Sequence, residues 1–435
     1  MSRTSGEELP NNRESVMLKS VKMPVAGSLL LRILLAAMLV TILGCSSGGG
    51  DDEGSNGGGG SPDSGEPPPA NADVLRVTSF NAGLLPNFVP LAAERVVPVA
   101  QAVAAHDADV LCLQEVWQAA DVQTVVGALQ RSYPSIYLPP VRQRFASRAP
   151  VCSTSDLEPI VSCVLTQCLF GTSGIFECLI GTCHDPLEDL AATNPECAQA
   201  ITAQTGRSSS EISDIQQELF SSSTPAGLFA FGGSSGLILA SKLPLEQVQL
   251  IDFFDITTTS RRAAIFATVT KNGVRHRIAC THLQSNLDGL IPYTGSLGSW
   301  AGEQRGQAER MLIGAANYSG SDPQYLAGDF NCSEGNNGTG VVGDLSENCR
   351  LFRDAGYGDV AGAQLGCSFC SSNLLNAANS SLAETRDVLL DHVFTQNLIF
   401  TGSAAQSVFT ERIAVNGAQT NLSDHFGVRV AVPVP

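Results

Sequence analysis

The most constraining feature of the chain is a series of short apolar runs, each ending in a polar side chain capable of chemistry. The runs are rich in β-branched residues and are separated by turn residues or by stretches with helical periodicity. Many short strands with intervening helices predict two packed sheets flanked by helices. The residues at the ends of these runs are Asn81, Glu115, His282, Asp329, Asn331, Asp391 and His425, the last preceded by Asp424.

The segment GDFNCSE, residues 328–334, shows how such an end can be interpreted. Asp329 and Asn331 follow an apolar run and a glycine, and both residue types form turns because their side chains bond to nearby backbone. The same two side chains could instead be directed at one ligand. A turn is sufficient to explain this segment alone. The ligand interpretation gains support because other strand ends carry matching polar groups.

Residues 1–44 are predicted to be a signal peptide. The segment SLLLRILLAAMLVTILGC follows a weakly basic start that includes Lys19 and Lys22, and its apolar core is too short for a membrane span. Its end, TILGCSS, resembles the bacterial lipobox, in which the cysteine is lipidated and becomes the mature N-terminus. We therefore expect lipidation at Cys45. An ordinary signal peptide or a single anchor helix is the alternative.

Residues 45–72 are predicted to be a flexible tether. They are mostly Gly, Ser, Pro and acidic residues without a large apolar side chain, so they cannot bury enough surface to become ordered. Ser46 after the cysteine resembles the pattern of outer-membrane lipoproteins. We therefore expect an exported lipoprotein at the bacterial cell surface or outer membrane, or released from it, with its folded domain in residues 73–435.

The charge of the chain disfavours a polyanionic partner. The whole chain carries −17, and without residues 1–44 it has 20 basic and 39 acidic side chains, a formal −19. Such a surface repels nucleic acid, although a local basic cleft is compatible with it. The densest basic group, Arg261, Arg262, Arg275 and Arg277, surrounds a hairpin predicted at KNG, 271–273. We interpret it as a solvated hairpin; a rim that attracts phosphate is the alternative.

The thirteen cysteines are typical of an exported, oxidised chain. Apart from Cys45, six lie within 152–197, four within 332–370, and Cys112 and Cys280 lie in apolar runs. We expect disulfides. A zinc site at the CSFC pair and unpaired core cysteines at 112 and 280 are the alternatives. Between about 145 and 225, helical patterns replace strands, which predicts a disulfide-stapled helical insertion with little core of its own.

Six motifs follow one another in the order SFNAG, LQEVW, THLQS, GDFN, LLDHVF and SDHFGV. In this order, over residues 74–432, they resemble the endonuclease/exonuclease/phosphatase superfamily. The resemblance implies a DNase I-like fold, a two-sheet, four-layer α/β sandwich. Within the superfamily the chain most resembles secreted bacterial neutral sphingomyelinases (sphingomyelinase C), in THLQS, GGSSGLILASKLPL and EQRGQAERML. The helical insertion, the cysteines and the lack of a recognisable aromatic membrane-docking hairpin are departures from that pattern.

The resemblance assigns a divalent cation, Mg²⁺ or another, to Glu115, with Asn81 and Asp424 beside it. The chemistry agrees with this assignment. Hydrolysis of a phosphodiester needs a cation to neutralise charge on the phosphate, and Mg²⁺ prefers oxygen ligands. Capping of the following helix is the alternative role for Glu115.

The resemblance also implies the roles of the remaining strand-end residues. His425 is the general base and Asp391 is the carboxylate that orients it. Asp329 and Asn331 position the water and hold a phosphate oxygen, while His282 donates to a phosphate oxygen or to the leaving group. Structural roles are the alternative for both histidines. The other histidines are predicted to be structural, for His392 on the opposite face of its strand, or at the surface, for His106, His184 and His276.

The resemblance thus implies a phosphoric diester hydrolase that converts sphingomyelin and water to ceramide and phosphocholine. A secreted DNA or RNA endonuclease with the same catalytic residues is the alternative. An adhesion or lipid-binding lipoprotein on an inactive scaffold is the alternative that is not an enzyme. The expected partners are a phospholipid substrate and a membrane reached through the lipid anchor, with nucleic acid only under the endonuclease interpretation. We expect a monomer.

Overall fold

The computed structural model describes residues 73–434 apart from 87, 169–178, 208–211, 319, 379–385 and 400–401. The predicted signal peptide, Cys45 and the tether lie outside the described residues. In the part of the chain that is described, no helix is both long and apolar enough to cross a bilayer.

Two six-stranded sheets form the centre of the fold. The first has the order β11–β14–β1–β2–β4–β3, with β1 (Val74–Leu84), β2 (Val110–Val116), β3 (Ser135–Tyr137), β4 (Ile238–Ser241), β11 (Ala404–Val408) and β14 (Gly427–Pro433). The second has the order β5–β6–β7–β8–β10–β9, with β5 (Glu246–Asp252), β6 (Ala263–Lys271), β7 (Val274–His282), β8 (Gln324–Asp329), β9 (Gly358–Asp359) and β10 (Asp391–Gln396). A separate hairpin joins β12 (Arg412–Val415) to β13 (Ala418–Asn421).

The two sheets pack face to face through their alternating apolar side chains. Val77 and Val110 of the first sheet share one buried cluster with Ile265, Ile278 and Tyr325 of the second. In the first sheet, β1 pairs parallel with β2 and antiparallel with β14. In the second, β7 pairs parallel with β8 and antiparallel with β6, so both sheets are mixed. The β-branched runs of the sequence therefore supply the interior of a sandwich.

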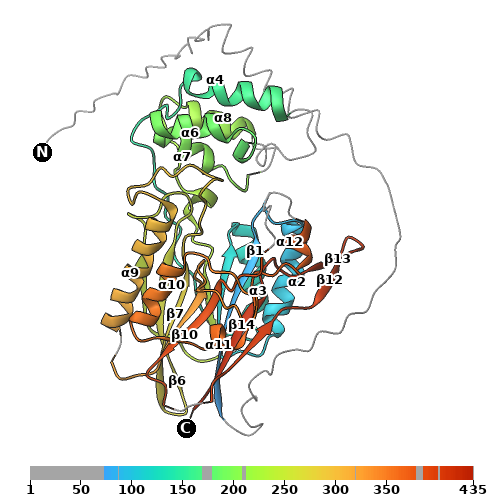
Figure 1. Ribbon diagram of the computed structural model, residues 1–435, viewed down its shortest axis with the longest axis vertical. Coiled ribbons are helices and arrows are strands. Elements are labelled where there is room, and N and C mark those ends of the chain that lie inside the picture. Colours follow the sequence, from blue (N-terminus) through green and yellow to red (C-terminus); the bar gives the residue numbers. More distant parts are fainter. Residues whose placement is uncertain are drawn as a thin grey trace, which may run out of the picture. The chain divides into compact units, whose positions relative to one another are not determined.

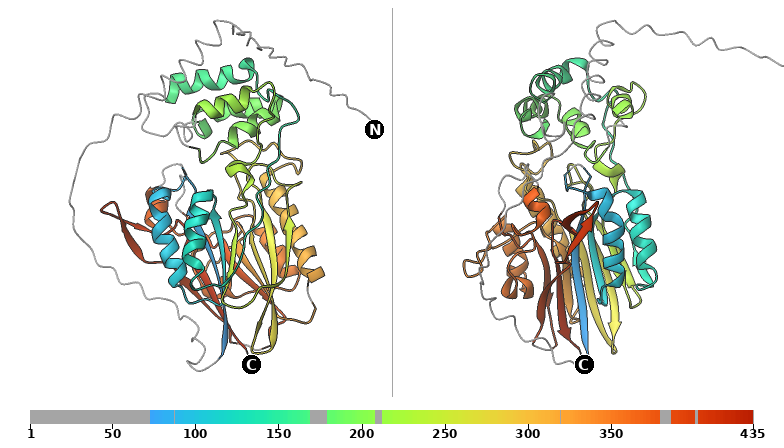
Figure 2. Two further views of the ribbon diagram at one scale, coloured as in Figure 1. Left: turned by 180° about the vertical axis from the view of Figure 1, so that it is seen from behind. Right: turned by 90° about the vertical axis from the view of Figure 1, so that its right-hand side faces the viewer.

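Helices cover the outer face of each sheet (Figure 1; Figure 2). Phe80 of β1 packs with α2 (Ala92–Ala105) and α3 (Ala119–Leu129). Phe266 of β6 packs with α9 (Trp300–Tyr318) and α10 (Ser346–Asp354). Two shorter helices, α11 (Val360–Gln364) and α12 (Leu374–Ala378), precede β10. The predicted two-sheet, four-layer α/β sandwich is confirmed.

Helices replace strands between β3 and β4. They are α4 (Thr154–Cys163), the π-helical η2 (Val164–Cys168), α6 (His184–Thr193), α7 (Pro195–Thr202) and α8 (Ile212–Phe220), followed by the short η4 (Ala230–Gly233). Disulfides join Cys152 to Cys197 and Cys163 to Cys183. The segment also has an apolar cluster of its own, centred on residues such as Leu187, which its small size alone did not predict.

The remaining described disulfides lie in the sandwich. Cys112 on β2 is joined to Cys280 on β7, so one covalent bond connects the two sheets, and neither residue is an unpaired core cysteine. Further disulfides are Cys332–Cys349 and Cys367–Cys370. The CSFC pair is therefore a disulfide and not a zinc site.

The predicted KNG turn forms the β6–β7 hairpin. Asn272 and Gly273 have φ of 51° and 77°, the left-handed conformation that such turns need. Arg275 and Arg277 lie on β7 beside the turn, where both pair with Asp322. These two arginines fit the predicted hairpin.

The interpretation as a solvated hairpin is wrong for the other two arginines. Arg261 and Arg262 lie at the opposite end of the nine-residue strand β6, and only 0% and 5% of their surfaces are exposed. All nine residues of β6 separate them from the turn, so closeness in sequence does not bring them to the hairpin loop. They lie instead beside the end of β7 that carries His282.

Candidate active site

Three of the predicted site residues form one row across the second sheet. His282 ends β7 and pairs in register with Asp329, which ends the parallel strand β8. Asp391 begins β10, which is antiparallel to β8, and pairs with Asp329 from the other side. These strand ends therefore meet at one edge of the sheet.

Residues of the first sheet meet this row through two hydrogen bonds. Asn81 of β1 donates from Nδ2 to Oδ2 of Asp329 at 2.9 Å. His425, two residues before β14, donates from Nδ1 to Oδ2 of Asp391 at 2.7 Å. All four residues are buried. The site is therefore built across the interface between the sheets.

Glu115 lies close to the same group. Its Oε1 is 4.0 Å from Nε2 of His282, and the same nitrogen is 3.5 Å from Oδ2 of Asp329. Glu115 has a φ of 57°, unusual for a residue other than glycine. Strain of this kind at a strand end is typical of residues that position a functional group.

The GDFN segment combines the two interpretations given above. Oδ1 of Asp329 accepts the backbone N–H of Asn331 at 2.8 Å, which is a turn, while its other oxygen accepts from Asn81. Asn331 has a φ of 48°, and its Nδ2 donates to the Leu283 carbonyl at 3.0 Å. One amide hydrogen of Asn331 therefore remains for a ligand.

The site concentrates negative charge in a buried volume. Burial and, after it, the neighbouring carboxylate of Asp424 raise the pKa of Glu115 to about 7. Burial and the carboxylate of Asp391 raise the pKa of Asp329 to about 6. Like charges held together out of water disfavour ionisation of each other.

This donor set fits a hard divalent cation. Glu115, Asp424 and Asn81 offer oxygen ligands, which suit Mg²⁺. The ligand atoms of Asp329, Asp391 and His425 also lie within 4.8 Å of one another. Oδ1 of Asp391 is buried without a hydrogen-bond partner. The carboxylate repulsion and this unpartnered oxygen both favour a positive ligand at the site.

The two predicted catalytic histidines have opposite charge preferences. Burial opposes the charge of His425, but the carboxylates of Asp391, Asp329 and Asp424 outweigh it and raise its pKa to about 10. Burial, followed by the charges of Arg262 and His425, holds the pKa of His282 well below its ordinary value. Without a cation at the site, these shifts favour a neutral His282 and a positively charged His425.

The sequence reasoning missed Gly83 and Ser423, which support Asp424. Ser423 donates from Oγ to Oδ1 of Asp424 at 3.0 Å and accepts the backbone N–H of His425 at 3.2 Å. Gly83 has a φ of 55°, and a β-carbon there would collide with Asp424 and Ser423. The glycine of SFNAG and the serine of SDHFGV were the available signals.

The CSFC loop also supports the site. Oγ of Ser368 accepts the backbone N–H groups of Leu390 and Asp391 at 2.9 and 3.0 Å. The ring of Phe369 meets the ring of His425 edge-on at 5.2 Å. The Cys367–Cys370 disulfide thus holds a loop against the Asp391–His425 pair.

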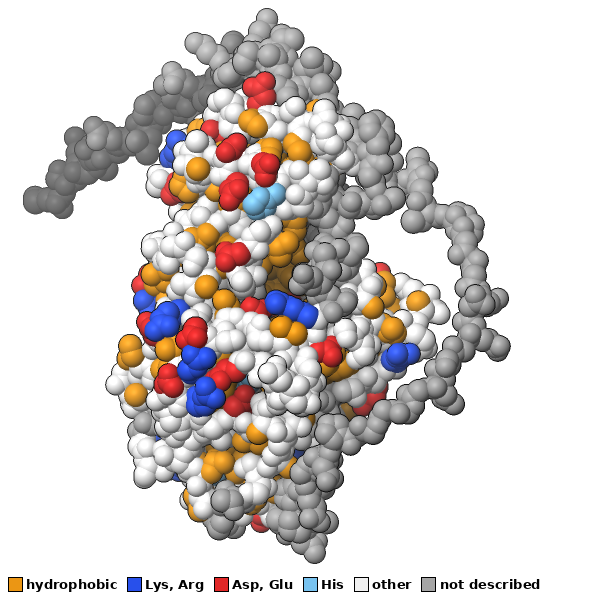
Figure 3. Space-filling view, in the orientation of Figure 1, with side chains coloured by type: hydrophobic (Ala, Val, Ile, Leu, Met, Phe, Trp, Pro, Cys, Tyr) orange, Lys and Arg blue, Asp and Glu red, His pale blue; other side chains and the backbone are white. Residues whose placement is uncertain are grey.

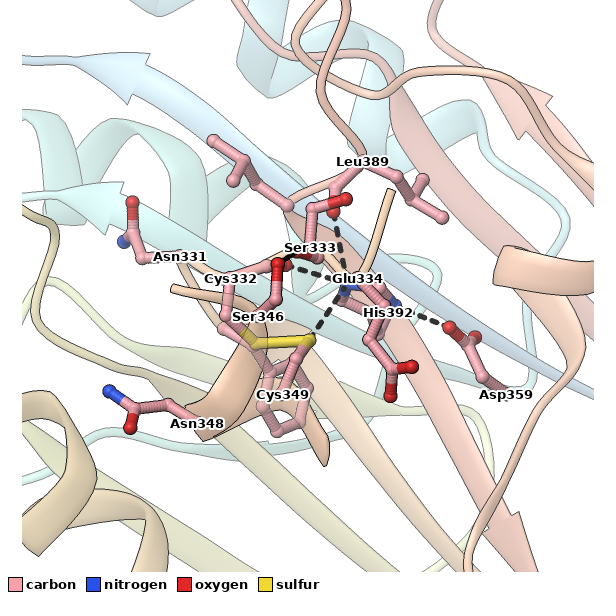
Figure 4. Close-up of a disulfide and its surroundings, with 12 residues drawn as sticks. Asn331, Cys332, Ser333, Glu334, Ser346, Asn348, Cys349, Asp359, Leu389 and His392 are labelled. Atoms are coloured by element: carbon pink, nitrogen blue, oxygen red, sulfur yellow. Dashed lines mark hydrogen bonds and ion pairs between the residues drawn. A yellow bond between two sulfur atoms is a disulfide. The ribbon is translucent and has the colours of Figure 1, made fainter. Parts of the chain in front are cut away.

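His392 follows Asp391 on β10 and so lies on the other face of the strand, as predicted, and Figure 4 shows its contacts there. Its Nδ1 is 2.9 Å from Oδ2 of Asp359, and its Nε2 is 3.0 Å from the carbonyls of Cys332 and Leu389. All these partners are acceptors, so both ring nitrogens donate and the ring is an imidazolium. Burial opposes this charge, but Asp359 outweighs it and raises the pKa of His392 to about 9.

The surface prediction is wrong for His276. Only 1% of its surface is exposed, and its Nδ1 is 3.2 Å from the hydroxyl of Tyr325. It lies on the same face of β7 as Ile278 and Cys280, which face the core. His106 and His184 are partly exposed.

The sandwich and this oxygen-rich site define a hydrolase of phosphate esters that depends on a divalent cation. The model of the endonuclease/exonuclease/phosphatase family matches residues 78–425, and the chain belongs to this family. A search of curated proteins finds no match.

Similar solved structures share low sequence identity with the chain. One is sphingomyelinase C from Streptomyces griseocarneus, at 16% identity, covering 83% of this chain and 99% of that one, with a TM-score of 0.46. Another is beta toxin from Staphylococcus aureus with bound magnesium ions, at 15% identity, covering 83% and 100%, with a TM-score of 0.47. A third is truncated TDP2 from Caenorhabditis elegans, at 13% identity, covering 83% and 98%, with a TM-score of 0.46. Structural similarity at these sequence identities and TM-scores does not indicate the substrate of this protein.

Proposed function

We propose that the protein hydrolyses a sphingomyelin-type phospholipid to ceramide and phosphocholine, by in-line attack of an activated water. Family membership supports hydrolysis of a phosphate ester. The observation that carries the reaction type is the pair of hydrogen bonds between the sheets, Asn81 to Asp329 and His425 to Asp391. These bonds assemble a general base, its orienting carboxylate and a set of phosphate-binding groups at one point.

His425 is the proposed general base. Its Nδ1 is committed to Asp391, so Nε2 is the nitrogen that takes the proton of the attacking water. Asp391 fixes the ring orientation and stabilises the imidazolium that forms. The water oxygen then forms the new bond to phosphorus while the bond to the ceramide oxygen breaks.

The neighbouring residues position the phosphate. Asp329 accepts from the side-chain amide of Asn81 and from the backbone N–H of Asn331, and the side-chain amide of Asn331 is held by the Leu283 carbonyl. The remaining amide hydrogen of Asn331 is available to a phosphate oxygen. Neutral His282 donates a hydrogen bond to a phosphate or leaving-group oxygen as phosphorus becomes five-coordinate.

Glu115 and Asp424, with Asn81, are the residues proposed to hold the cation. A divalent cation there would supply positive charge that stabilises the phosphate as it becomes more negative and lowers the pKa of His425 toward neutrality. Ser423 and Gly83 keep the Asp424 carboxylate in place for this role.

The distribution of basic residues supports a lipid over a nucleic acid. A nuclease needs a basic track along the strand, but many arginines here pair with acidic neighbours. Lys and Arg on the face shown in Figure 3 lie among Asp and Glu and form no continuous track. The ion pairs include Arg305–Glu309, Arg310–Asp255, Arg350–Glu347, Arg353–Glu334 and Arg386–Asp344.

The proposed location is the membrane surface, through lipidation at Cys45. The TILGCSS segment and the polar tether that follows it support this proposal. An anchor of this kind places the enzyme next to a lipid bilayer, and the proposed substrate is a bilayer lipid.

The experiment that tests the substrate is a panel assayed with Mg²⁺ and with EDTA. The panel comprises sphingomyelin, phosphatidylcholine, single- and double-stranded DNA, and inositol phosphates. We expect Mg²⁺-dependent release of phosphocholine from sphingomyelin in mixed micelles. Efficient cleavage of DNA without release of phosphocholine would support the endonuclease instead, and inactivity on every substrate would support a binding protein.

A further inference from the structure

Arg262 is a buried cation whose donors are only partly used. Only 5% of the surface of Arg262 is exposed. Its Nε and Nη1 are buried and have no hydrogen-bond partner among the described residues. Two other buried arginines differ. Arg95 donates to the carbonyls of Pro90, Ala82, Gly83 and Leu422, and Arg261 donates to Asp252 and to backbone carbonyls. Burying an unpaired charge costs folding free energy, unless a bound ligand supplies the counter-charge and the hydrogen-bond acceptors.

The guanidinium lies beside the catalytic residues. Its central carbon is 5.4 Å from the centroid of the Trp117 ring, which is itself 6.1 Å from the His282 ring. The charges that act most strongly on Arg262 are the carboxylates of Glu115 and Asp329, yet no ion pair joins it to either within the described structure. Arg262 therefore lies close enough to these carboxylates for their charges to act on it, but its guanidinium is not paired with either of them.

Other unpartnered polar atoms occur among the residues of the site and beside Trp117. Nδ1 of His282, Oδ1 of Asp391 and Nε1 of Trp117 are also buried without partners among the described residues. Buried polar groups in native proteins are nearly always paired, so a cluster of exceptions at one point indicates a ligand site. The guanidinium donors of Arg262 and the indole N–H of Trp117 are among these atoms, which indicates a ligand with an anionic acceptor group.

The segment that carries Arg262 is held from three directions. Glu303 of α9 accepts from the backbone and the hydroxyl of Thr258. Arg144 donates to the carbonyls of Thr257 and Thr258, at 2.8 and 3.0 Å. Gln199, on α7 of the helical insertion, also donates to the Thr258 carbonyl. Arg262 thus follows a fixed segment, which keeps its donors preorganised for a ligand.

We infer that Arg262 binds a non-bridging oxygen of the substrate phosphate through its Nε and Nη donors, and that it is a substrate-binding residue of the reaction. A guanidinium presents donors in a fixed fork that matches phosphate geometry. Its charge also stabilises the phosphate as negative charge accumulates in the transition state. The inference rests on phosphate-ester hydrolysis at this site and is independent of the head group. The helical insertion then has a supporting role in substrate binding, because its Gln199 helps to hold the segment around Thr258 that precedes Arg262.

The test compares Arg262→Met and Arg262→Lys with Arg277→Met in the full-length, detergent-solubilised protein. Arg277 pairs with Asp322 beside the hairpin turn, so its replacement removes the same charge far from the site. Binding of inorganic phosphate is measured by calorimetry in Mg²⁺ buffer, and kcat/KM is measured on bis(p-nitrophenyl) phosphate. Neither probe contains choline or ceramide, so the result does not depend on the sphingomyelin proposal.

We expect Arg262→Met to weaken phosphate binding at least tenfold and to reduce kcat/KM by about 10²–10³-fold, the scale of a lost transition-state donor. Arg262→Lys should recover part of both, since a lysine keeps the charge but not the fork. Arg277→Met should match the wild type. Wild-type phosphate affinity in Arg262→Met would overturn the inference. If that variant does not fold, wild-type affinity and rate in Arg262→Lys would overturn it.

Discussion

His425 donates a hydrogen bond of 2.7 Å to Asp391, and the two residues come from opposite sheets of the sandwich. The bond between Asn81 and Asp329 crosses the same interface. The catalytic geometry therefore depends on how the sheets are placed against each other. The Cys112–Cys280 disulfide joins the same two sheets covalently and keeps this placement fixed.

We expect Glu115→Gln to abolish nearly all activity. The neutral amide keeps the shape of the side chain but removes the charge that holds the cation, and loss of a single electrostatic group of this kind costs roughly 3–4 kcal/mol of transition-state stabilisation. The measurements are kcat in saturating Mg²⁺ and Mg²⁺ affinity by calorimetry. Glu309→Gln, on the exposed side of α9, is the control. Full activity in EDTA would contradict the prediction.

His425→Ala and His282→Ala should each reduce kcat by about 10²–10⁴-fold, the usual range for general acid–base groups. Their far-ultraviolet circular dichroism should match the wild type, since neither ring is part of the apolar core. His184→Ala, on the helical insertion, is the control and should retain wild-type kcat. A wild-type rate in His425→Ala would rule out this residue as the base.

The motif residues could be predicted from the sequence because each lies at one end of an apolar run or within a few residues of it. Runs of this kind give strands, and strands that share a sheet bring their ends to a common edge. That reasoning placed His282, Asp329 and Asp391 together, and the observed register across β7, β8 and β10 agrees. The two-layer packing followed from the same alternation of apolar side chains.

The supporting residues could not be predicted in this way because their roles depend on tertiary contacts. Arg262 was grouped with Arg275 by sequence density, yet β6 carries the two arginines to opposite ends of the hairpin. Ser368 lies in a cysteine-rich segment whose path to Asp391 has no local sequence signal. The polar sequence around His276 predicts an exposed side chain, but the position of this residue on β7 places the side chain in the interior.

Stability should decrease above neutral pH through His392. The folded-state pKa is raised to about 9, above the ordinary unfolded value of about 6.5, so its contribution is fully present below pH 6.5 and is lost as the pH rises through 9. The difference corresponds to about 3 kcal/mol. Urea unfolding of the wild type and His392→Gln at pH 6.5 and 9.5 measures this. The gap between the two proteins should shrink at the higher pH; a constant gap would contradict the prediction.

Cys45→Ser should release the protein from membranes. A lipid anchor with more than one acyl chain binds a bilayer stably, whereas the polar residues of the tether have no affinity for hydrocarbon. Fractionation of cells that express each form, together with labelling by a palmitate analogue, measures the effect. A wild-type protein that takes up no label would exclude lipidation. If the Cys45→Ser protein remained in the membrane fraction, another part of the chain would have to bind the membrane.

Gly83→Ala should weaken cation binding without unfolding the protein. An alanine β-carbon would collide with the Asp424 carboxylate and Ser423, and φ of 55° is unfavourable for alanine by about 1 kcal/mol. Displacement of a group that orients a metal ligand typically costs 10–100-fold in affinity. We therefore expect about that loss in Mg²⁺ affinity, measured by calorimetry, with a smaller loss of kcat when Mg²⁺ is saturating.

Gly127→Ala is the matched control for this change. Gly127 lies on the exposed side of α3, and a β-carbon there meets no atom within 4 Å. The same substitution in an open helical position should stabilise the fold by up to about 1 kcal/mol and leave Mg²⁺ affinity unchanged. Of the two added β-carbons, only the one at position 83 would meet the Asp424 carboxylate. Equal Mg²⁺ affinity in Gly83→Ala and Gly127→Ala would therefore mean that Asp424 does not hold the cation.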